Sequence, residues 1–128
     1  MARQDLFPIL NCVDLVAARA FYERVFAGVV TYRFPAEGEA VYLVLRIGDG
    51  QLALGYGGAP AMYGEVPRPA SGHAVDLCLY VDDLDATLDR AVAAGAPIPV
   101  PAQETPWGET VAYVQDPAGT MLLVIQSA

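Results

Sequence analysis

The chain has 128 residues, a length suited to one domain with one core, and 55% of them are hydrophobic. Acidic residues outnumber basic ones by 15 to 7, which gives a net charge of −8. Binding to nucleic acid or to an anionic membrane requires a basic face, so we expect neither partner. An acidic surface suits an apolar soluble protein and attracts small cations. No signal core is visible in residues 1–5, so we expect a cytoplasmic location.

The first half of the chain predicts a strand, a helix and three further strands. An apolar run over residues 6–13 predicts the first strand, and Asp14 is a favourable helix N-cap. Apolar residues at spacings of three and four then continue to a stop at Gly28. Strand-like runs follow at 29–34, 40–47 and 51–56, and the sequence Gly48-Asp49-Gly50 predicts a hairpin turn between the last two.

Residues 57–72 are rich in glycine, proline and alanine and lack periodicity, which predicts a linker. We expect it to be solvated, with a flap carrying Met62 and Tyr63 as the alternative. A single domain is thus predicted, with module 1 at 1–58, the linker at 59–72 and module 2 at 73–128.

The second half predicts the same order of elements. A strand at 74–81 precedes a helix that Asp83 caps and Gly95 ends, and prolines at 97, 99 and 101 favour an extended or edge segment. Strands at 110–114 and 120–125 complete the module. Asp14 and Asp83 lie 69 residues apart, as do Gly50 and Gly119. We therefore predict an α+β fold in which two tandem βαβββ modules form a curved mixed sheet around a shared cleft.

Three stretches of the chain resemble the vicinal oxygen chelate superfamily, which includes glyoxalase I, extradiol dioxygenases and bleomycin-resistance proteins. They are DLVAARAFY at 14–22, VDDLD at 81–85, and Trp107-Gly108 followed by DPAG at 116–119. They fall in the expected order across nearly the whole chain. The resemblance implies paired βαβββ modules around a cleft, and commonly a homodimer.

Metal enzymes of that superfamily take one ligand from the first strand and one from the last strand of each module. Counted from the matched motifs, these positions are Phe7, Leu54, Asp76 and Leu123. Phenylalanine and leucine offer no lone pair, and one carboxylate does not make a tight site. We therefore predict no metal and no other cofactor. The single histidine, His73, is expected to be an exposed loop residue on the opposite side from Asp76.

Strand alternation predicts an apolar and aromatic cleft that contains one carboxylate, Asp76, our candidate catalytic residue. The carboxylate would anchor a cationic or hydrogen-bond-donating ligand, or act as a base with a raised pKa. Alternatively, a backbone amide, Arg46 or a tyrosine hydroxyl satisfies it. Tyr32 and Phe34 are further candidates for the wall. The ligand-binding candidates are Phe7, Asn11, Leu54, Tyr56, Asp76, Tyr80, Trp107, Met121 and Leu123.

Two functions from different classes fit these residues. The first is a metal-free binding protein similar to the bleomycin-resistance branch, whose members sequester an aromatic, often cationic natural product without a reaction. The second is a small lyase, isomerase or epimerase acting on a carbonyl compound, with Asp76 as base and Tyr80 or Tyr56 as hydrogen-bond donor. A dimerising accessory domain without a ligand is a third. We favour the first, because no motif places a second titrating partner beside Asp76.

Overall fold

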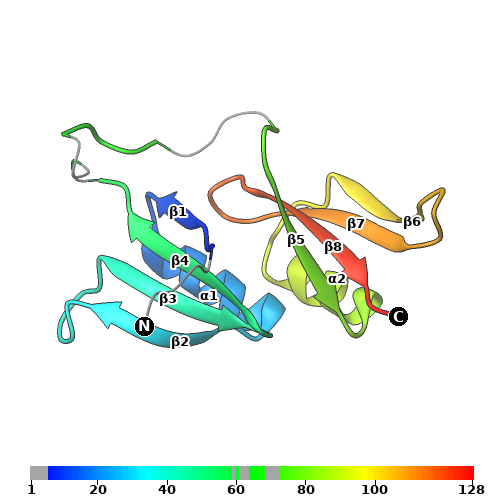
Figure 1. Ribbon diagram of the computed structural model, residues 1–128, viewed down its shortest axis with the longest axis horizontal. Helices are drawn as coiled ribbons and strands as arrows, with labels where there is room; N and C mark the ends of the chain where they lie inside the picture. The colour runs from blue at the N-terminus through cyan, green and yellow to red at the C-terminus, as the bar shows by residue number, and fades with distance from the viewer. Residues whose placement is uncertain (1–5, 59, 61–63, 69–72) are drawn as a thin grey trace.

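The computed structural model describes residues 6–58, 60, 64–68 and 73–128, and within them two βαβββ modules follow one another (Figure 1). This confirms the predicted α+β class and the predicted order of elements. Module 1 consists of β1 (Ile9–Cys12), α1 (Leu15–Phe26), β2 (Val29–Phe34), β3 (Tyr42–Ile47) and β4 (Gly50–Tyr56). Module 2 consists of β5 (Asp76–Val81), α2 (Leu84–Ala93), β6 (Val100–Glu104), β7 (Thr110–Gln115) and β8 (Met121–Gln126).

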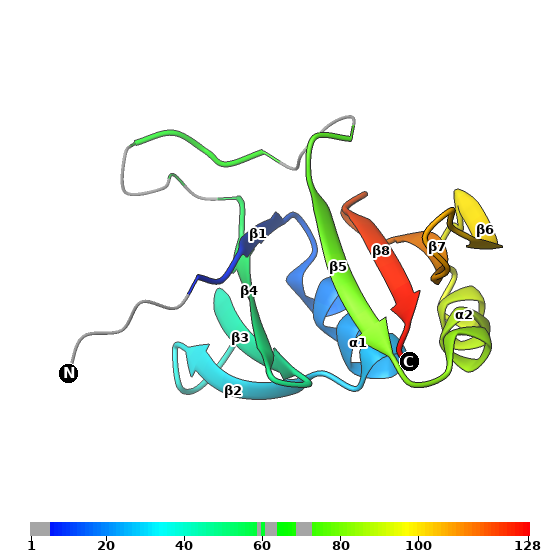
Figure 2. The same cartoon turned by 45° about the vertical axis from the view of Figure 1, so that its right-hand side comes forward.

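Each module forms its own four-stranded mixed sheet. Sheet A has the order β1-β4-β3-β2 and sheet B the order β5-β8-β7-β6. The first and last strands of each module pair in parallel and the other neighbours pair antiparallel. The helices cover one side of the sheets, with α1 behind β3 and β4 and α2 behind β5 and β8 in the view of Figure 1. The side of each sheet away from the helices is called its open face below, and Figure 2 shows the two sheets from a second direction.

Both helices begin where the sequence predicts. Asp14 accepts a hydrogen bond from the Ala17 amide at 2.9 Å, and Asp83 accepts one from the Ala86 amide at 3.0 Å. These carboxylates satisfy amides that the first helical turn leaves without a partner. None of the helices in the described residues is long and apolar enough to cross a membrane.

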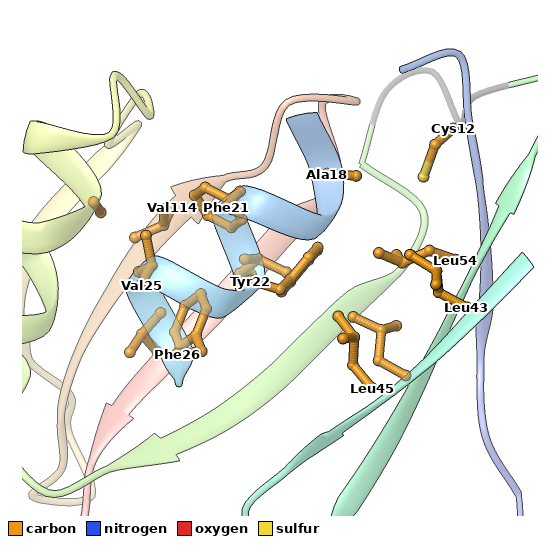
Figure 3. Packing of buried hydrophobic residues seen from close by; sticks show 14 of the residues in the cluster. Cys12, Ala18, Phe21, Tyr22, Val25, Phe26, Leu43, Leu45, Leu54 and Val114 are labelled. Carbon is orange, nitrogen blue, oxygen red and sulfur yellow. The ribbon is translucent and has the colours of Figure 1, made fainter. Parts of the chain in front are cut away.

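Helix α1 lies at the centre of the molecule and joins the two modules. Phe21 packs edge to face with Tyr22 and with Phe26, the rings of Tyr22 and Phe26 are tilted to each other, and Tyr22 is fully buried. Figure 3 shows Tyr22 pointing toward leucines of β3 and β4, and Phe21 beside Val114 of β7. The Tyr22 hydroxyl donates a buried hydrogen bond of 2.6 Å to Asp116, which lies in the turn before β8. A single hydrophobic core therefore spans both modules.

Several boundaries differ from those predicted. The first strand starts at Ile9 rather than residue 6, the third at Tyr42 rather than 40, and the fifth at Asp76 rather than 74. The proline-rich stretch leads into β6, an edge strand whose pairing with β7 is irregular between Val100 and Gln103. Met62 and Tyr63, the side chains proposed for a flap, lie outside the described residues.

The spacing of the repeat changes by one residue before the last strand. Leu10 pairs with Leu54 in sheet A, and its counterpart Leu79, 69 residues later, pairs with Val124, which is 70 residues after Leu54. The cause lies in the turns, because two residues separate the paired Ile47 and Gly50, whereas three separate Asp116 and Thr120, whose backbones are hydrogen-bonded at the equivalent place. The counterpart of Leu123 is therefore Ala53 and not Leu54.

Candidate functional site

The open face of sheet B brings together four of the predicted ligand-binding residues. Asp76 and Tyr80 alternate along β5 with leucines that pack towards the helix layer. Met121 is the direct partner of Asp76 on β8, and Leu123 lies two residues further along that strand. The neighbouring strand β7 adds Tyr113, the partner of Leu123. The result is a face with one carboxylate among aromatic and aliphatic side chains.

Two side chains hold the Asp76 carboxylate in place. The Tyr113 hydroxyl donates a 2.7 Å hydrogen bond to Oδ2, and the His73 imidazole contacts Oδ1 through Nε2. The ring of His73 stands edge-on to that of Tyr113 at a centroid distance of 5.3 Å. The Asp76 side chain remains 26% exposed, so a ligand on the open face has access to it.

These contacts change the acidity expected of Asp76. Partial burial pushes its pKa upward, but the hydrogen bonds from Tyr113 and His73 and the charge of His73 outweigh this, and the pKa falls below its usual value. The hydrogen bond to Asp76 also raises the pKa of Tyr113, with burial as the second cause. The expectation of a base with a raised pKa is therefore wrong. At neutral pH the face presents an ionised carboxylate.

Sequence reasoning missed both partners of Asp76. His73 was expected on the opposite side of a strand that began at residue 74, but the strand begins at Asp76, so alternation does not apply to His73. Tyr113 corresponds to the tyrosine hydroxyl that was one of the alternatives for satisfying the carboxylate. Its position on β7, where it alternates with the buried Ala112 and Val114, was the signal that could have identified it.

Three predicted residues do not lie on the open face around Asp76. Leu54 is 0% exposed and packs in the core against α1, because its pairing with Leu43 places it on the helix side of sheet A (Figure 3). Tyr56 shares that side by alternation, and its ring lies against Gly58. Trp107 is 72% exposed in the turn between β6 and β7, where its Nε1–H donates to Glu109 at 2.8 Å.

The remaining two candidates belong to module 1. Phe7 lies just before β1 and is part-exposed, and Asn11 is half-buried on β1. Asn11 lies on the open face of sheet A, because its neighbours Leu10 and Cys12 pack into the core. Tyr32 and Phe34, the suggested wall residues, lie on the same open face and remain exposed. The ring of Tyr32 packs against Tyr42 at a centroid distance of 6.1 Å, so this second face is also aromatic.

The donor set at the superfamily's metal positions does not fit a divalent ion. With the corrected register, these positions hold Phe7, Ala53, Asp76 and Leu123, of which only Asp76 has a ligating atom. Among the described residues, no group of three or more His, Cys, Asp or Glu side chains is arranged to hold a metal.

Comparison with known proteins agrees with the geometry. Residues 6–124 match the model of the Glyoxalase/Bleomycin resistance protein/Dioxygenase superfamily. The chain belongs to this superfamily. An uncharacterized protein of Mycobacterium tuberculosis (strain H37Rv) is 32% identical over 118 residues, which cover 89% of this chain and 69% of that protein.

Two solved structures are similar to the chain along its length. TioX from Micromonospora sp. ML1 is 28% identical with a TM-score of 0.77, over 98% of this chain and 100% of that chain. A bleomycin resistance determinant encoded on the transposon Tn5 is 25% identical with a TM-score of 0.67, over 98% of both chains. The similarity to each therefore extends over both modules.

Proposed function

We propose that this superfamily member binds an aromatic cation on the open face of sheet B and sequesters it without a metal and without a reaction. The observation that carries the proposal is the ionised Asp76 carboxylate, held by Tyr113 and His73 on a face of aromatic and aliphatic side chains. A carboxylate has about four lone-pair sites, so two partners leave room for a ligand.

The ligand class follows from the chemistry of this face. A cationic group pairs with Asp76, while an aromatic body packs on Met121 and Leu123 and against the ring of Tyr80, which is 68% exposed. The net charge of −8 raises the local concentration of cations around the protein. Similarity to a bleomycin resistance determinant supports the same class of function.

The alternative is a lyase, isomerase or epimerase in which Asp76 removes a proton from a carbonyl compound. A general base works best when its pKa lies near the working pH. Interactions with Tyr113 and His73 instead move the pKa of Asp76 further from neutrality, because they stabilise its ionised form. The geometry thus favours an anchor for a cation over a proton acceptor.

The proposal is tested by isothermal titration calorimetry with benzyltrimethylammonium, whose charge does not change with pH. We expect the Asp76→Asn variant to bind it about tenfold or more weakly than the wild type, because an ion pair on a partly desolvated face is lost. Asp89→Asn, at an exposed position on α2, removes the same charge away from this face and should leave the affinity within about twofold.

A neutral ligand of the same shape, neopentylbenzene, serves as the matched probe. It should bind the wild type and Asp76→Asn equally, since it depends on apolar contact alone. Equal affinity of the cation for wild type and Asp76→Asn, or no binding of the cation to either, would overturn the proposal. The homodimer that the superfamily resemblance implies stays a prediction, which sedimentation equilibrium checks.

A further inference from the structure

The single histidine of the chain, His73, lies beside the carboxylate of the proposed cation site. Its Nε2 contacts Oδ1 of Asp76, and its ring stands edge-on to Tyr113, whose hydroxyl donates to Oδ2. Holding the carboxylate in place requires only a neutral ring. An imidazole gains a full positive charge when it takes up a proton, so His73 acts on Asp76 in two different charge states.

The two charge states of His73 leave Asp76 with different free charge. A neutral imidazole donates at most one hydrogen bond, and the carboxylate keeps its full negative charge for a ligand. A protonated imidazole is itself a cation, and its Nε2 forms a salt bridge with Oδ1 of Asp76. A cationic ligand and the imidazolium then share one carboxylate and repel each other.

The other ionisable groups beside His73 keep their charge between pH 5.5 and 7.5. Strand β5 contributes Asp76 and Cys78, β7 contributes Tyr113, and β8 has no ionisable side chain. The pKa of Asp76 is lowered from 3.8 and the hydrogen bond to Asp76 raises the pKa of Tyr113, so the carboxyl stays ionised and the phenol neutral. Thiols ordinarily titrate above about pH 8. Among the described residues around this carboxylate, His73 is therefore the group whose charge changes in this range.

Solvent access sets the size of the effect. The side chain of His73 is 46% exposed and that of Asp76 is 26% exposed. Water screens an ion pair at such a position, which makes it weaker than a buried pair. We therefore expect full protonation of His73 to change the affinity for a cation about fivefold, and not by orders of magnitude.

We propose that His73 is a proton-controlled competitor for Asp76, so that the site holds its cation at neutral pH and releases it as the pH falls. This inference rests on the proposed function, because it concerns the same carboxylate and the same aromatic cation. It adds regulation, since mild acid unloads the protein without a change of fold. Release begins well above the pH at which Asp76 itself takes up a proton.

The first test is calorimetric titration of the protein with benzyltrimethylammonium at pH 7.5 and at pH 5.5. The charge of this probe is independent of pH, so a change in affinity comes from the protein. We expect binding to be about three- to fivefold weaker at pH 5.5. His73→Gln keeps a hydrogen-bond donor beside Asp76 but takes up no proton, so its affinities at the two pH values should agree within about 1.5-fold. A pH dependence that persists in His73→Gln would overturn the inference.

A histidine placed elsewhere is the matched control. Val92 is exposed on α2, in the helix layer and away from the open face of sheet B. Val92→His in the His73→Gln protein restores a titrating group at a distance from Asp76. Its cation affinity should stay independent of pH, because solvent screens charges separated by more than about 10 Å. A pH dependence that returns in this protein would show an effect of net charge alone, and the role of His73 would be refuted.

The second measurement follows the proton on His73 itself, which is straightforward because the chain has no other histidine. A proton NMR titration of the imidazole C–H signals gives the midpoint with and without saturating benzyltrimethylammonium. The cation and the proton must weaken each other equally, so a fivefold effect on affinity appears as a midpoint lowered by about 0.7 pH unit. An unchanged midpoint would contradict the competition.

The outcomes separate this inference from the proposed function. Equal cation affinity of the wild type at pH 7.5 and 5.5 overturns the role of His73 and leaves the role of Asp76 standing. Absence of cation binding at both pH values overturns both. Neutral neopentylbenzene should bind equally at the two pH values, because it makes no ion pair. A pH dependence as large as that of the cation would show that the fold responds to pH, and would also overturn the inference.

Discussion

The two modules share a plan but differ in what occupies equivalent positions. In module 1, Tyr22 fills the space beneath the sheet, and its counterpart in module 2, 69 residues later, is Ala91. In module 2, Asp76 provides the carboxylate of the open face, and its counterpart in module 1 is Phe7. Module 1 has thus put the aromatic residues of its helix into the core that joins the halves, whereas module 2 has a carboxylate on its open face.

A duplicated fold can separate the residues that stabilise it from those that recognise a ligand. Helix α1 buries six residues and α2 buries three, although both start at equivalent aspartate caps. The burial of α1 comes from its central position, where it packs on sheet A and donates through Tyr22 to the turn before β8. Substitutions in α1 should therefore affect folding, and substitutions on the open face of sheet B should affect binding.

The largest expected effect is the loss of the Tyr22 ring. Tyr22→Ala creates a cavity beneath sheet A and leaves the buried Asp116 without its hydroxyl donor. We expect the free energy of unfolding to fall by about 3–5 kcal/mol, as measured by urea denaturation. Tyr113→Ala, on the part-exposed open face, should cost only about 1 kcal/mol.

Tyr22→Phe then separates the ring from the hydroxyl. It keeps the packing and removes only the hydrogen bond to Asp116, so we expect a loss of about 1–3 kcal/mol. A cost below about 0.5 kcal/mol for Tyr22→Ala would contradict the central role assigned to α1.

The two cysteines offer a second contrast between the modules. Burial, followed by the negative charges of Asp116 and Asp14, raises the pKa of the Cys12 thiol to about 11, whereas Cys78 is exposed on β5. Because the thiolate is the reactive form, we expect Cys12 to react with a disulfide reagent at pH 8 about 100-fold more slowly than Cys78. Stopped-flow absorbance with Ellman's reagent measures both rates.

Cys78→Ser should remove the fast phase of this reaction and leave the slow one. Denaturation in urea should make the two thiols react alike, since burial no longer protects Cys12. A fast phase that persists in Cys78→Ser would show that the core around Cys12 opens readily.

The smallest expected effect concerns the acidity of Asp76. Its pKa lies below the ordinary value of 3.8 in the folded protein, because its hydrogen bonds and the charge of His73 outweigh partial burial. The lowered pKa stabilises the folded state. This stabilisation is fully present above pH 3.8 and is lost as the pH falls through the lowered pKa. A carbon-13 NMR titration of the Asp76 carboxyl should therefore show a midpoint below 3.8.

Tyr113→Phe removes the strongest stabilising contact of that carboxylate, so the midpoint should move upward towards the ordinary value. Tyr80→Phe, on the same open face, is the control and should leave the midpoint unchanged. An Asp76 midpoint above 3.8 in the wild type would reverse the argument and favour a role as base.

Local signals in the sequence predicted most of the fold. The two aspartate caps and the order of ten elements depend on neighbouring residues, and the structure has them where they were expected. Helix α1 ends earlier than predicted, because Ala27 and not Gly28 takes the left-handed cap position. The position of Leu54 was not predictable in this way. It depends on the pairing of β4 with β3, and the one-residue change in the repeat becomes visible only when the strands are paired.

The candidate site was predictable in part. Alternation along β5 placed Asp76 and Tyr80 on one face, because this depends on one strand alone. Tyr113 lies 37 residues away from Asp76. Alternation along β7 indicates which face Tyr113 occupies, but it does not report that this side chain meets the carboxylate of another strand. The hydrogen bond from Tyr113 lowers the pKa of Asp76. Because this contact was not predicted, the expectation of a raised pKa was wrong.

The hydrogen bond between Tyr22 and Asp116 has a consequence for how this chain can be divided. Each module buries part of its own core, yet α1 completes its packing only with the turn before β8 in the other module. The two modules therefore pack against each other as two subunits would, although they belong to one chain. Because one chain carries both modules, the halves stay at a high effective concentration. Two polypeptides divided between β4 and β5 would retain the Tyr22–Asp116 hydrogen bond and the shared core described here, and should reassociate.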